Sequence, residues 1–215
     1  MKNKGRYNVS GLKEAQFEPG SGDRVLRNLQ GVTDPEDMDI MEANALAVAM
    51  DDILRKFDRE HRFTADDICL IHKIWLGKIY QWAGQYRQVN ISKGGFTFAM
   101  AAQVSKLMGQ LEQEQLRKST PCTFEDNKKV VEAIAEVHTE LVLIHPFREG
   151  NGRVSRVLAT LMALQAGLPL LDFSTMNEQK EQYFAAVHAG LDRNYKPMET
   201  LFSEVIENSA SAPGG

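Results

Sequence analysis

The stretch that decides the fold runs from residue 145 to residue 156 and reads His-Pro-Phe-Arg-Glu-Gly-Asn-Gly-Arg-Val-Ser-Arg. A helical apolar pattern over residues 125–144 runs directly into it. The proline that follows His145 disfavours helical backbone at that histidine, so we expect the first helix to end there. A second helical pattern begins near Asn151 or Gly152. The sequence therefore predicts a short junction between two consecutive helices.

This junction has the features of an anion site. Gly150 and Gly152 lack a Cβ atom, so the backbone can turn tightly and direct several N–H groups at one point. Those N–H groups lie at the start of a helix, where the helix dipole also attracts negative charge. Arg153 and Arg156 are neighbours on the first turns of the same helix. Two guanidinium groups beside a glycine-rich turn suit phosphate groups better than a single carboxylate.

Two further side chains of the junction favour chemistry on a phosphate. Glu149 is a carboxylate in a positive setting, and one carboxylate together with phosphate oxygens commonly holds Mg²⁺. His145 can accept a proton near neutral pH, because its unperturbed pKa is about 6.5. Each feature alone has an ordinary explanation as a capping histidine, a glycine turn or a solvated arginine face. Their combination favours phosphoryl or nucleotidyl transfer to a protic nucleophile.

The composition of the whole chain excludes several other classes. Its 215 residues carry a formal net charge of −4, which gives no electrostatic reason to expect nucleic-acid binding. Cys69 and Cys122 lie far apart and form no Cys-x-x-Cys pair, which excludes a disulfide scaffold or a cysteine zinc cluster. No apolar run is long enough to span a membrane, and the first residues lack the apolar core of a secretory signal. We therefore expect no membrane association and a cytoplasmic location.

Helical patterns cover most of the chain and predict an all-α fold. Asp34 before Pro35 is typical of a helix start, and Thr64 can cap a second helix. Residues 85–98 differ: they read QYRQVNISKGGFTF, an alternating pattern followed by two glycines, which predicts a short β-hairpin packed on the helices. The expected organisation is an N-terminal arm over residues 1–30, one domain over residues 31–208 and a disordered tail over residues 209–215.

Residues 145–156 also resemble the signature of the Fic family, H-P-F-x-[DE]-G-N-G-R-x-x-R, at every fixed position. Residues 82–87, Trp-Ala-Gly-Gln-Tyr-Arg, and the hairpin that follows resemble the flap of that family. Residues 32–36, Val-Thr-Asp-Pro-Glu, resemble the lead-in of bacterial members described as cell-filamentation proteins. The resemblance covers about residues 25–208 and implies the Fic fold, a helical bundle with a short β-hairpin flap.

The resemblance implies an enzyme that transfers AMP from ATP, with Mg²⁺, to a Tyr, Ser or Thr hydroxyl of a target protein. His145 would be the general base and Glu149 the Mg²⁺ ligand. The nucleotide-binding residues that it implies are Gly150, Asn151, Gly152, Arg153, Arg156 and Tyr183. Asn151 would contact the α- and β-phosphates, and the two arginines the β- and γ-phosphates. Tyr183 would contact adenine, although Gly190 replaces an asparagine that some members keep.

The family's flap and inhibitory helix imply two further sets of residues. The flap residues that would dock the target by strand addition are Val89, Asn90, Ile91, Ser92, Lys93 and Phe96. Many members carry an inhibitory helix with the pattern [ST]-x-x-x-E-[GN], which Ser203, Glu207 and Asn208 match within a predicted helix at about residues 197–208. Glu207 would pair with Arg156 and act as a built-in brake, released when the helix detaches or an oligomer dissociates.

Several alternatives stay open at the level of sequence. A protein kinase of the Doc branch is disfavoured, because that branch has lysine at the position of Gly152. Removal of AMP, with Glu207 positioning a water molecule, and transfer of another phosphate-containing group share the same signature. A non-catalytic nucleotide-binding module has no need of a base such as His145, and a metal hydrolase is disfavoured by scattered histidines. A bacterial topoisomerase is a candidate target, and a homo-oligomer is a candidate assembly.

Overall fold

The computed structural model describes residues 11–93 and 95–211 and is mostly helical, which confirms the predicted all-α class. The long helices are α1 (Pro35–Lys56), α2 (Ala65–Leu76), α3 (Val104–Leu111), α5 (Asn127–Ile144), α6 (Asn151–Gln165), α8 (Lys180–Ala189) and α9 (Lys196–Ser211). Shorter helical segments are η1 (Lys13–Ala15), η2 (Ala101–Gln103), the π-helical η3 (Glu112–Leu116), α4 (Arg117–Ser119), α7 (Ser174–Glu178) and η4 (Gly190–Asp192). None of the helices in these ranges combines the length and the apolar character that a membrane crossing requires.

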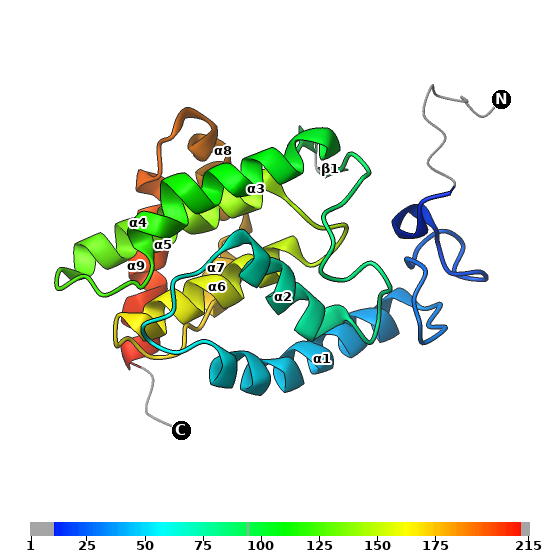
Figure 1. The fold of residues 1–215 in the computed structure, drawn as a ribbon, viewed down its shortest axis with the longest axis horizontal. Coiled ribbons are helices and arrows are strands. Elements are labelled where there is room, and N and C mark those ends of the chain that lie inside the picture. The colour runs from blue at the N-terminus through cyan, green and yellow to red at the C-terminus, as the bar shows by residue number, and fades with distance from the viewer. Residues whose placement is uncertain (1–10, 94, 212–215) are drawn as a thin grey trace.

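The helices α5 and α6 form the centre of the molecule. Figure 1 shows them between α1 on one side and the run from α3 to α4 on the other. The two central helices pack on each other, α9 packs on α5, and α1 packs on α2. Ile134 of α5, Leu158 of α6 and Phe202 of α9 are completely buried in this core. The junction between α5 and α6 therefore lies on a rigid support.

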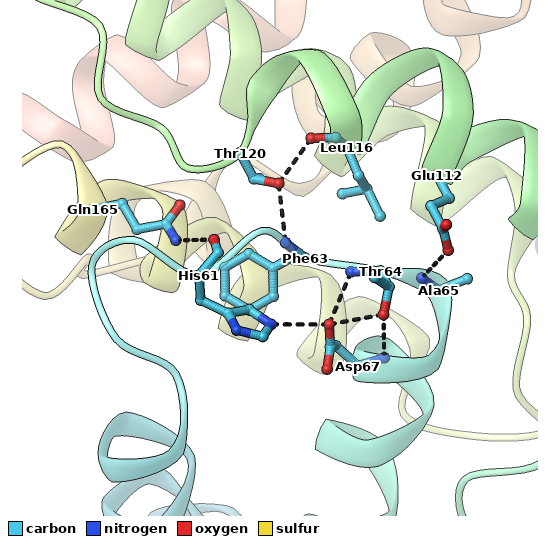
Figure 2. Close-up of polar contacts among 9 residues, drawn as sticks. All are labelled: His61, Phe63, Thr64, Ala65, Asp67, Glu112, Leu116, Thr120 and Gln165. Carbon is cyan, nitrogen blue, oxygen red and sulfur yellow. Dashed lines mark hydrogen bonds and ion pairs between the residues drawn. The ribbon is translucent and has the colours of Figure 1, made fainter.

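The predicted helix starts at Asp34 and Thr64 are confirmed. The Asp34 side chain accepts hydrogen bonds from the backbone N–H groups of Glu36 and Asp37, with proline at the first position of α1. Thr64 forms a capping box with Asp67 at the start of α2. Figure 2 shows this box together with the ring of His61, which contacts the same carboxylate at 3.0 Å. Both helix starts therefore satisfy backbone donors that would otherwise lack partners.

The start of α2 is tied to two other parts of the bundle. The Phe63 N–H donates to the Thr120 hydroxyl at 3.0 Å, and the Ala65 N–H donates to the Glu112 carboxylate at 3.0 Å (Figure 2). The Gln165 amide, at the end of α6, donates to the His61 carbonyl at 2.6 Å. These bonds fix the position of α2, whose last residues, Trp75 and Leu76, lie close to Gly150 in the α5–α6 junction.

Both ends of the chain differ in detail from the expectation. Residues 11–30 are largely irregular, but they lie against the domain, and Val25 is buried in the common core. Leu29 donates a backbone hydrogen bond to the Ile79 carbonyl at 2.8 Å. At the other end, α9 continues through Ser211, which lies inside the range 209–215 expected as a tail. Residues 1–10 and 212–215 lie outside the described residues.

The predicted hairpin is present as a two-stranded antiparallel sheet. Its strands are β1 (Ser92–Lys93) and β2 (Phe96–Thr97), in the register Ser92 opposite Thr97 and Lys93 opposite Phe96. This hairpin is shorter than the sequence pattern suggested, because residues 85–91 lead into it as irregular chain.

Candidate active site

The α5–α6 junction has the predicted form. Helix α5 ends before His145, which adopts left-handed backbone angles of φ 54° and ψ 60°. Helix α6 begins at Asn151, directly after Gly150. Between them, Phe147 is completely buried and its ring stacks on His72 with centroids 3.9 Å apart. The buried ring anchors the junction and leaves His145 on the side of the cavity.

The side chain of Asn151 is used inside the junction. The Phe147 N–H donates to Asn151 Oδ1 at 2.7 Å, and Asn151 Nδ2 donates to the Phe147 carbonyl at 2.8 Å. The asparagine is 3% exposed, so both polar ends of its amide are occupied. The phosphate contact predicted for Asn151 is therefore available from its backbone N–H at the helix start and not from its side chain.

Gly150 is required by both backbone and space, so we expect Gly150→Ala to destabilise the protein. Its φ is +82°, and an added Cβ would lie 2.7 Å from Cζ3 of the Trp75 ring. A side chain at such angles costs roughly 1–3 kcal/mol, and the overlap adds to this cost. Urea unfolding of Gly150→Ala should show a loss of at least about 2 kcal/mol in the free energy of unfolding.

Gly152 provides the matched control, because an added Cβ there meets nothing within 4 Å. Its backbone is helical, so Gly152→Ala should unfold within about 1 kcal/mol of the wild type. Equal stability of the two variants would contradict the close approach of Gly150 to Trp75.

His145 is held in an orientation suited to a base. Its Nδ1 lies 3.2 Å from the Val142 carbonyl, and since a carbonyl only accepts, we assign the proton to Nδ1. The ring stacks on Phe98 with centroids 3.6 Å apart. Burial lowers the pKa of His145 to about 4, and the positive charges of Arg87 and Lys93 act in the same direction. The imidazole is therefore neutral at pH 7, with Nε2 free to accept a proton.

This lowered pKa predicts an unusual pH dependence. A histidine with a pKa of about 6.5 would be roughly nine-tenths protonated at pH 5.5, whereas His145 stays mostly neutral there. For a reaction in which His145 acts as the base, we expect kcat/KM at pH 5.5 to remain within about twofold of its value at pH 7.5. A fall of about tenfold, with folding verified by circular dichroism at each pH, would contradict this environment for His145.

Arg87 connects the junction to the hairpin, and sequence reasoning did not single it out as a site residue. It is 1% exposed, and its guanidinium donates to the carbonyls of His145 at 2.6 Å and Val89 at 2.8 Å. It also donates to the carbonyls of Ile144 and Ala99. One buried cation therefore satisfies the end of α5 and both legs of the hairpin.

The junction opens into a cavity of about 940 Å³. This volume falls within the range of roughly 300–1,000 Å³ that small-molecule sites occupy. The predicted site residues that line it are His145, Glu149, Gly150, Gly152, Arg153, Arg156, Tyr183, Lys93 and Phe96. Other lining residues come from residues 24–26, from α1 and from α8, together with Tyr80, Phe98 and Val142. The cavity brings most of the sequence-predicted residues together.

Besides Glu149, Arg153 contacts residues that no sequence motif indicated. Its Nη2 donates to the carboxylate of Glu42 on α1 and lies 3.6 Å from Glu149 Oε1. Its guanidinium lies over the Trp75 ring, 4.6 Å from the centroid. The Tyr80 hydroxyl donates to the other oxygen of Glu42 at 2.7 Å. The charge of Arg153 is thus fixed at one end of the cavity.

The guanidinium of Arg156 carries a positive charge for which the described part of the chain provides no hydrogen-bond or ion-pair partner. Its guanidinium lies 5.4 Å from the Phe173 ring centroid and 5.9 Å from that of Tyr183. Its Nε is buried without a hydrogen-bond partner, and no ion pair to it is found within residues 11–93 and 95–211. A buried donor of this kind fits an anionic ligand.

The predicted inhibitory residues do not reach Arg156. Glu207 is exposed on α9 and does not line the cavity. The Ser203 hydroxyl donates to the Glu199 carbonyl in its own helix, and the Asn208 amide donates to the Thr175 hydroxyl. The expected contact between Glu207 and Arg156 is therefore not formed in this structure. Helix α9 packs through Phe202 and Val205, which turns Glu207 outward.

Tyr183 of α8 lines the cavity, and its hydroxyl contacts a residue that does not. That hydroxyl is 3.0 Å from Nε2 of the buried His138, so the tyrosine offers its ring to a ligand. Burial lowers the pKa of His138 to about 3, so it stays neutral.

The packing around position 190 explains why a glycine stands there, since an added Cβ would lie 2.3 Å from Cγ2 of Thr139. An asparagine side chain at that position does not fit this packing.

The hairpin contributes to the cavity through its aromatic residues. The Phe96 ring stacks on His188 of α8 with centroids 4.7 Å apart, and Phe98 stacks on His145. Other predicted flap residues serve the base of the hairpin: Asn90 accepts from the Ala101 N–H, Ile91 accepts from the Phe98 N–H, and Val89 accepts from Arg87. The Ser92 and Thr97 hydroxyls lie 3.0 Å apart across the two strands.

Fold and site together define a helical protein in which a histidine, a glycine turn at a helix start and two arginines line one cavity. The model of the Fic/DOC family matches residues 62–163. The protein adenylyltransferase VbhT of Bartonella schoenbuchensis is 31% identical over 157 residues, which cover 73% of this chain and 32% of that protein. The probable protein adenylyltransferase Fic of Escherichia coli K12 is 30% identical over 146 residues, which cover 66% of this chain and 69% of that protein. The chain belongs to the Fic/DOC family.

Solved structures agree with this assignment. The N-terminal Fic domain of a putative cell filamentation protein from Bartonella quintana, solved with bound ADP, has a TM-score of 0.73 and 25% sequence identity, and the match covers 90% of this chain and 95% of that one. The relatives named above are nucleotidyltransferases, which confirms the predicted class of enzyme. The chain spans about a third of the length of VbhT.

Proposed function

We propose that this chain is a protein adenylyltransferase, which transfers AMP from ATP to a hydroxyl side chain of a target protein. The observation that carries the proposal is one cavity that holds both a neutral His145 and the start of α6 with Arg153 and Arg156. Relatives named protein adenylyltransferases and a related domain solved with ADP support a nucleotide donor. The residue assignments below belong to this proposal.

The proposed reaction uses the chain's own groups as follows. The N–H groups at the start of α6 bind the α-phosphate of ATP, and the two arginines bind the β- and γ-phosphates. The Tyr183 ring faces the adenine ring. His145 Nε2 takes the proton of the target hydroxyl. The hydroxyl oxygen forms a bond to the α-phosphorus, and the bond to the bridging oxygen breaks. Pyrophosphate leaves with that electron pair, and the target carries AMP.

Glu149 fits a role as the Mg²⁺ ligand. Its Oε1 accepts from the Gly150 N–H at 2.8 Å, which holds the carboxylate at the mouth of the anion site. No group of three or more potential metal-ligating side chains is found within the described ranges. A single hard oxygen ligand beside phosphate oxygens is the arrangement that Mg²⁺ accepts. When bound, the ion would neutralise charge on the phosphates.

A protein kinase on the same fold is the second candidate, and Gly152 disfavours it. The position of a Cβ at Gly152 is open space that faces the cavity, so the glycine leaves room for phosphate groups. Removal of AMP assisted by Glu207 is also disfavoured, since Glu207 is exposed. We leave a Glu207 brake out of the proposal for the same reason. A topoisomerase target, a cytoplasmic location and self-association stay predictions.

Label transfer in bacterial lysate tests the proposal. ATP labelled at the α-phosphate should label target proteins, whereas ATP labelled at the γ-phosphate should not. Label from the γ position alone would identify a kinase and overturn the proposal. Absence of label from either position, in lysates where ATP binding to the purified chain is verified, would favour a nucleotide-binding module instead.

A further inference from the structure

We propose that Glu42 is a positioning residue for the phosphate site: it fixes the Arg153 guanidinium in the orientation that receives the β-phosphate of the donor. This proposal rests on the proposed function, because it assumes a nucleotide with more than one phosphate. Glu42 lies 111 positions before Arg153, in a different helix, and belongs to no motif in the sequence.

The environment of Glu42 is unusual for a carboxylate. Its side chain is 3% exposed, and both oxygens have partners. Oε1 accepts from the Tyr80 hydroxyl at 2.7 Å and Oε2 accepts from Arg153. The backbone carbonyl of the same residue accepts from Trp75 Nε1 at 2.8 Å. Because an unpaired buried carboxylate is costly, this placement is stable only while Arg153 and Tyr80 keep their positions.

Trp75 completes the constraint on the arginine. The Glu42 carboxylate fixes one edge of the guanidinium, and the indole ring lies beneath its plane at 4.6 Å from the centroid. An edge contact and a face contact together determine both the position and the tilt of a planar group. The same indole ring lies next to Gly150. Trp75 therefore fixes the position of the Arg153 guanidinium relative to the glycine turn at the start of α6.

The pairing with Glu42 leaves the rest of the guanidinium available. Within residues 11–93 and 95–211, the hydrogen bond and ion pairs of Arg153 all involve Nη2. Nε and Nη1 therefore remain for a phosphate group that faces the cavity. Glu42 and a phosphate group would therefore use different nitrogens of the guanidinium, which makes the carboxylate a support and not a competitor.

The energetic effect follows from pre-ordering. An arginine side chain loses rotamer entropy when it binds a ligand, which weakens binding. An arginine side chain that is already ordered in the free protein avoids that cost. Only ligands that reach Arg153 benefit. ADP and ATP carry a β-phosphate and should depend on Glu42, whereas AMP should not.

The test compares the affinities of the 215-residue chain for ADP and AMP by calorimetry. We expect Glu42→Gln to weaken ADP binding by about tenfold or more and to change AMP binding by less than about twofold. Tyr80→Phe removes the hydrogen bond from the Tyr80 hydroxyl to Glu42 and keeps the contact between Glu42 and Arg153. It should weaken ADP binding by about threefold, again without an effect on AMP binding. Glu36→Gln, on an exposed turn of α1, is the matched control and should bind both nucleotides as the wild type does.

A double variant separates positioning from a general structural role. If Glu42 acts through Arg153, Glu42→Gln adds no further loss of ADP affinity in an Arg153→Gln background. Equal losses for ADP and AMP, or tighter ADP binding in Glu42→Gln, would overturn the proposal. If Glu42→Gln does not fold, an unchanged ADP-to-AMP affinity ratio in Tyr80→Phe overturns it. A wild-type chain that binds neither nucleotide overturns the proposed function itself, which distinguishes the two failures.

Discussion

Replacing His145 with alanine is expected to lower the rate of AMP transfer by about 10²–10⁴-fold, the contribution of a positioned general base. The imidazole is neutral at pH 7, with Nδ1 directed at the Val142 carbonyl and Nε2 left as the proton acceptor. Alanine removes that acceptor and leaves the phosphate site in place. The measurement is the initial rate of label transfer from α-labelled ATP, beside ATP affinity from calorimetry.

ATP affinity of His145→Ala should stay within about threefold of the wild type, because the phosphate contacts belong to α6 and not to the histidine. A matched control is His61→Ala, a histidine beside the capping box of α2 and outside the cavity lining. Transfer that survives in His145→Ala at more than about a tenth of the wild-type rate would contradict the role of His145 as base.

Arg87→Lys is expected to cost about 3–5 kcal/mol in the free energy of unfolding. The guanidinium is buried and donates to the carbonyls of Ile144, His145, Val89 and Ala99. A lysine has the charge but only one nitrogen, so it leaves several buried carbonyls without partners. Urea unfolding measures the loss, and the hairpin should lose hydrogen-exchange protection before the helical core does.

Arg148→Lys is the matched control, because Arg148 lies in the same junction but, among residues 11–93 and 95–211, its side chain donates one hydrogen bond, to the Glu14 carbonyl. It should cost less than about 1 kcal/mol. A similar small loss for Arg87→Lys would show that the link between the hairpin and the α5–α6 junction is not a major source of stability.

The junction could be predicted from the sequence because its causes are local. The proline after His145 ends α5, the angles at Gly150 need glycine, and Asp34 and Thr64 start helices through their own side chains. The same holds for the hairpin, whose glycines and alternation lie next to each other in the chain. Short-range rules are sufficient where all the interacting atoms are close in sequence.

The support of the site could not be predicted, because it depends on long-range packing. Glu42 reaches Arg153 only through the packing of α1 on α2 and of α2 on α6. Arg87 donates to the carbonyl of Ile144, the last residue of α5, only because the chain around the hairpin packs against the junction. The sequence offered one signal of this support. Glu42 is a charged residue on the face of α1 that is otherwise buried and apolar. A single sequence does not say which charge is buried.

Glu207 is a residue that the sequence motif predicted for the site and that the structure places outside it. The spacing of Ser203 and Glu207 correctly predicts that they share one side of a helix, since they are four positions apart in α9. Which side faces the core is decided by the packing of α9 on α5, through Phe202 and Val205. A local pattern therefore identified the helix but not the residue that Arg156 would meet.

The mass of the modified target residue tests the central claim most directly. A labelled target protein would be purified, digested and analysed by mass spectrometry, with material from the His145→Ala variant as the control. The account predicts a Tyr, Ser or Thr residue that carries one AMP group through its hydroxyl oxygen, absent from the control. A residue that carries a single phosphate group, or AMP that appears equally with His145→Ala, would contradict it.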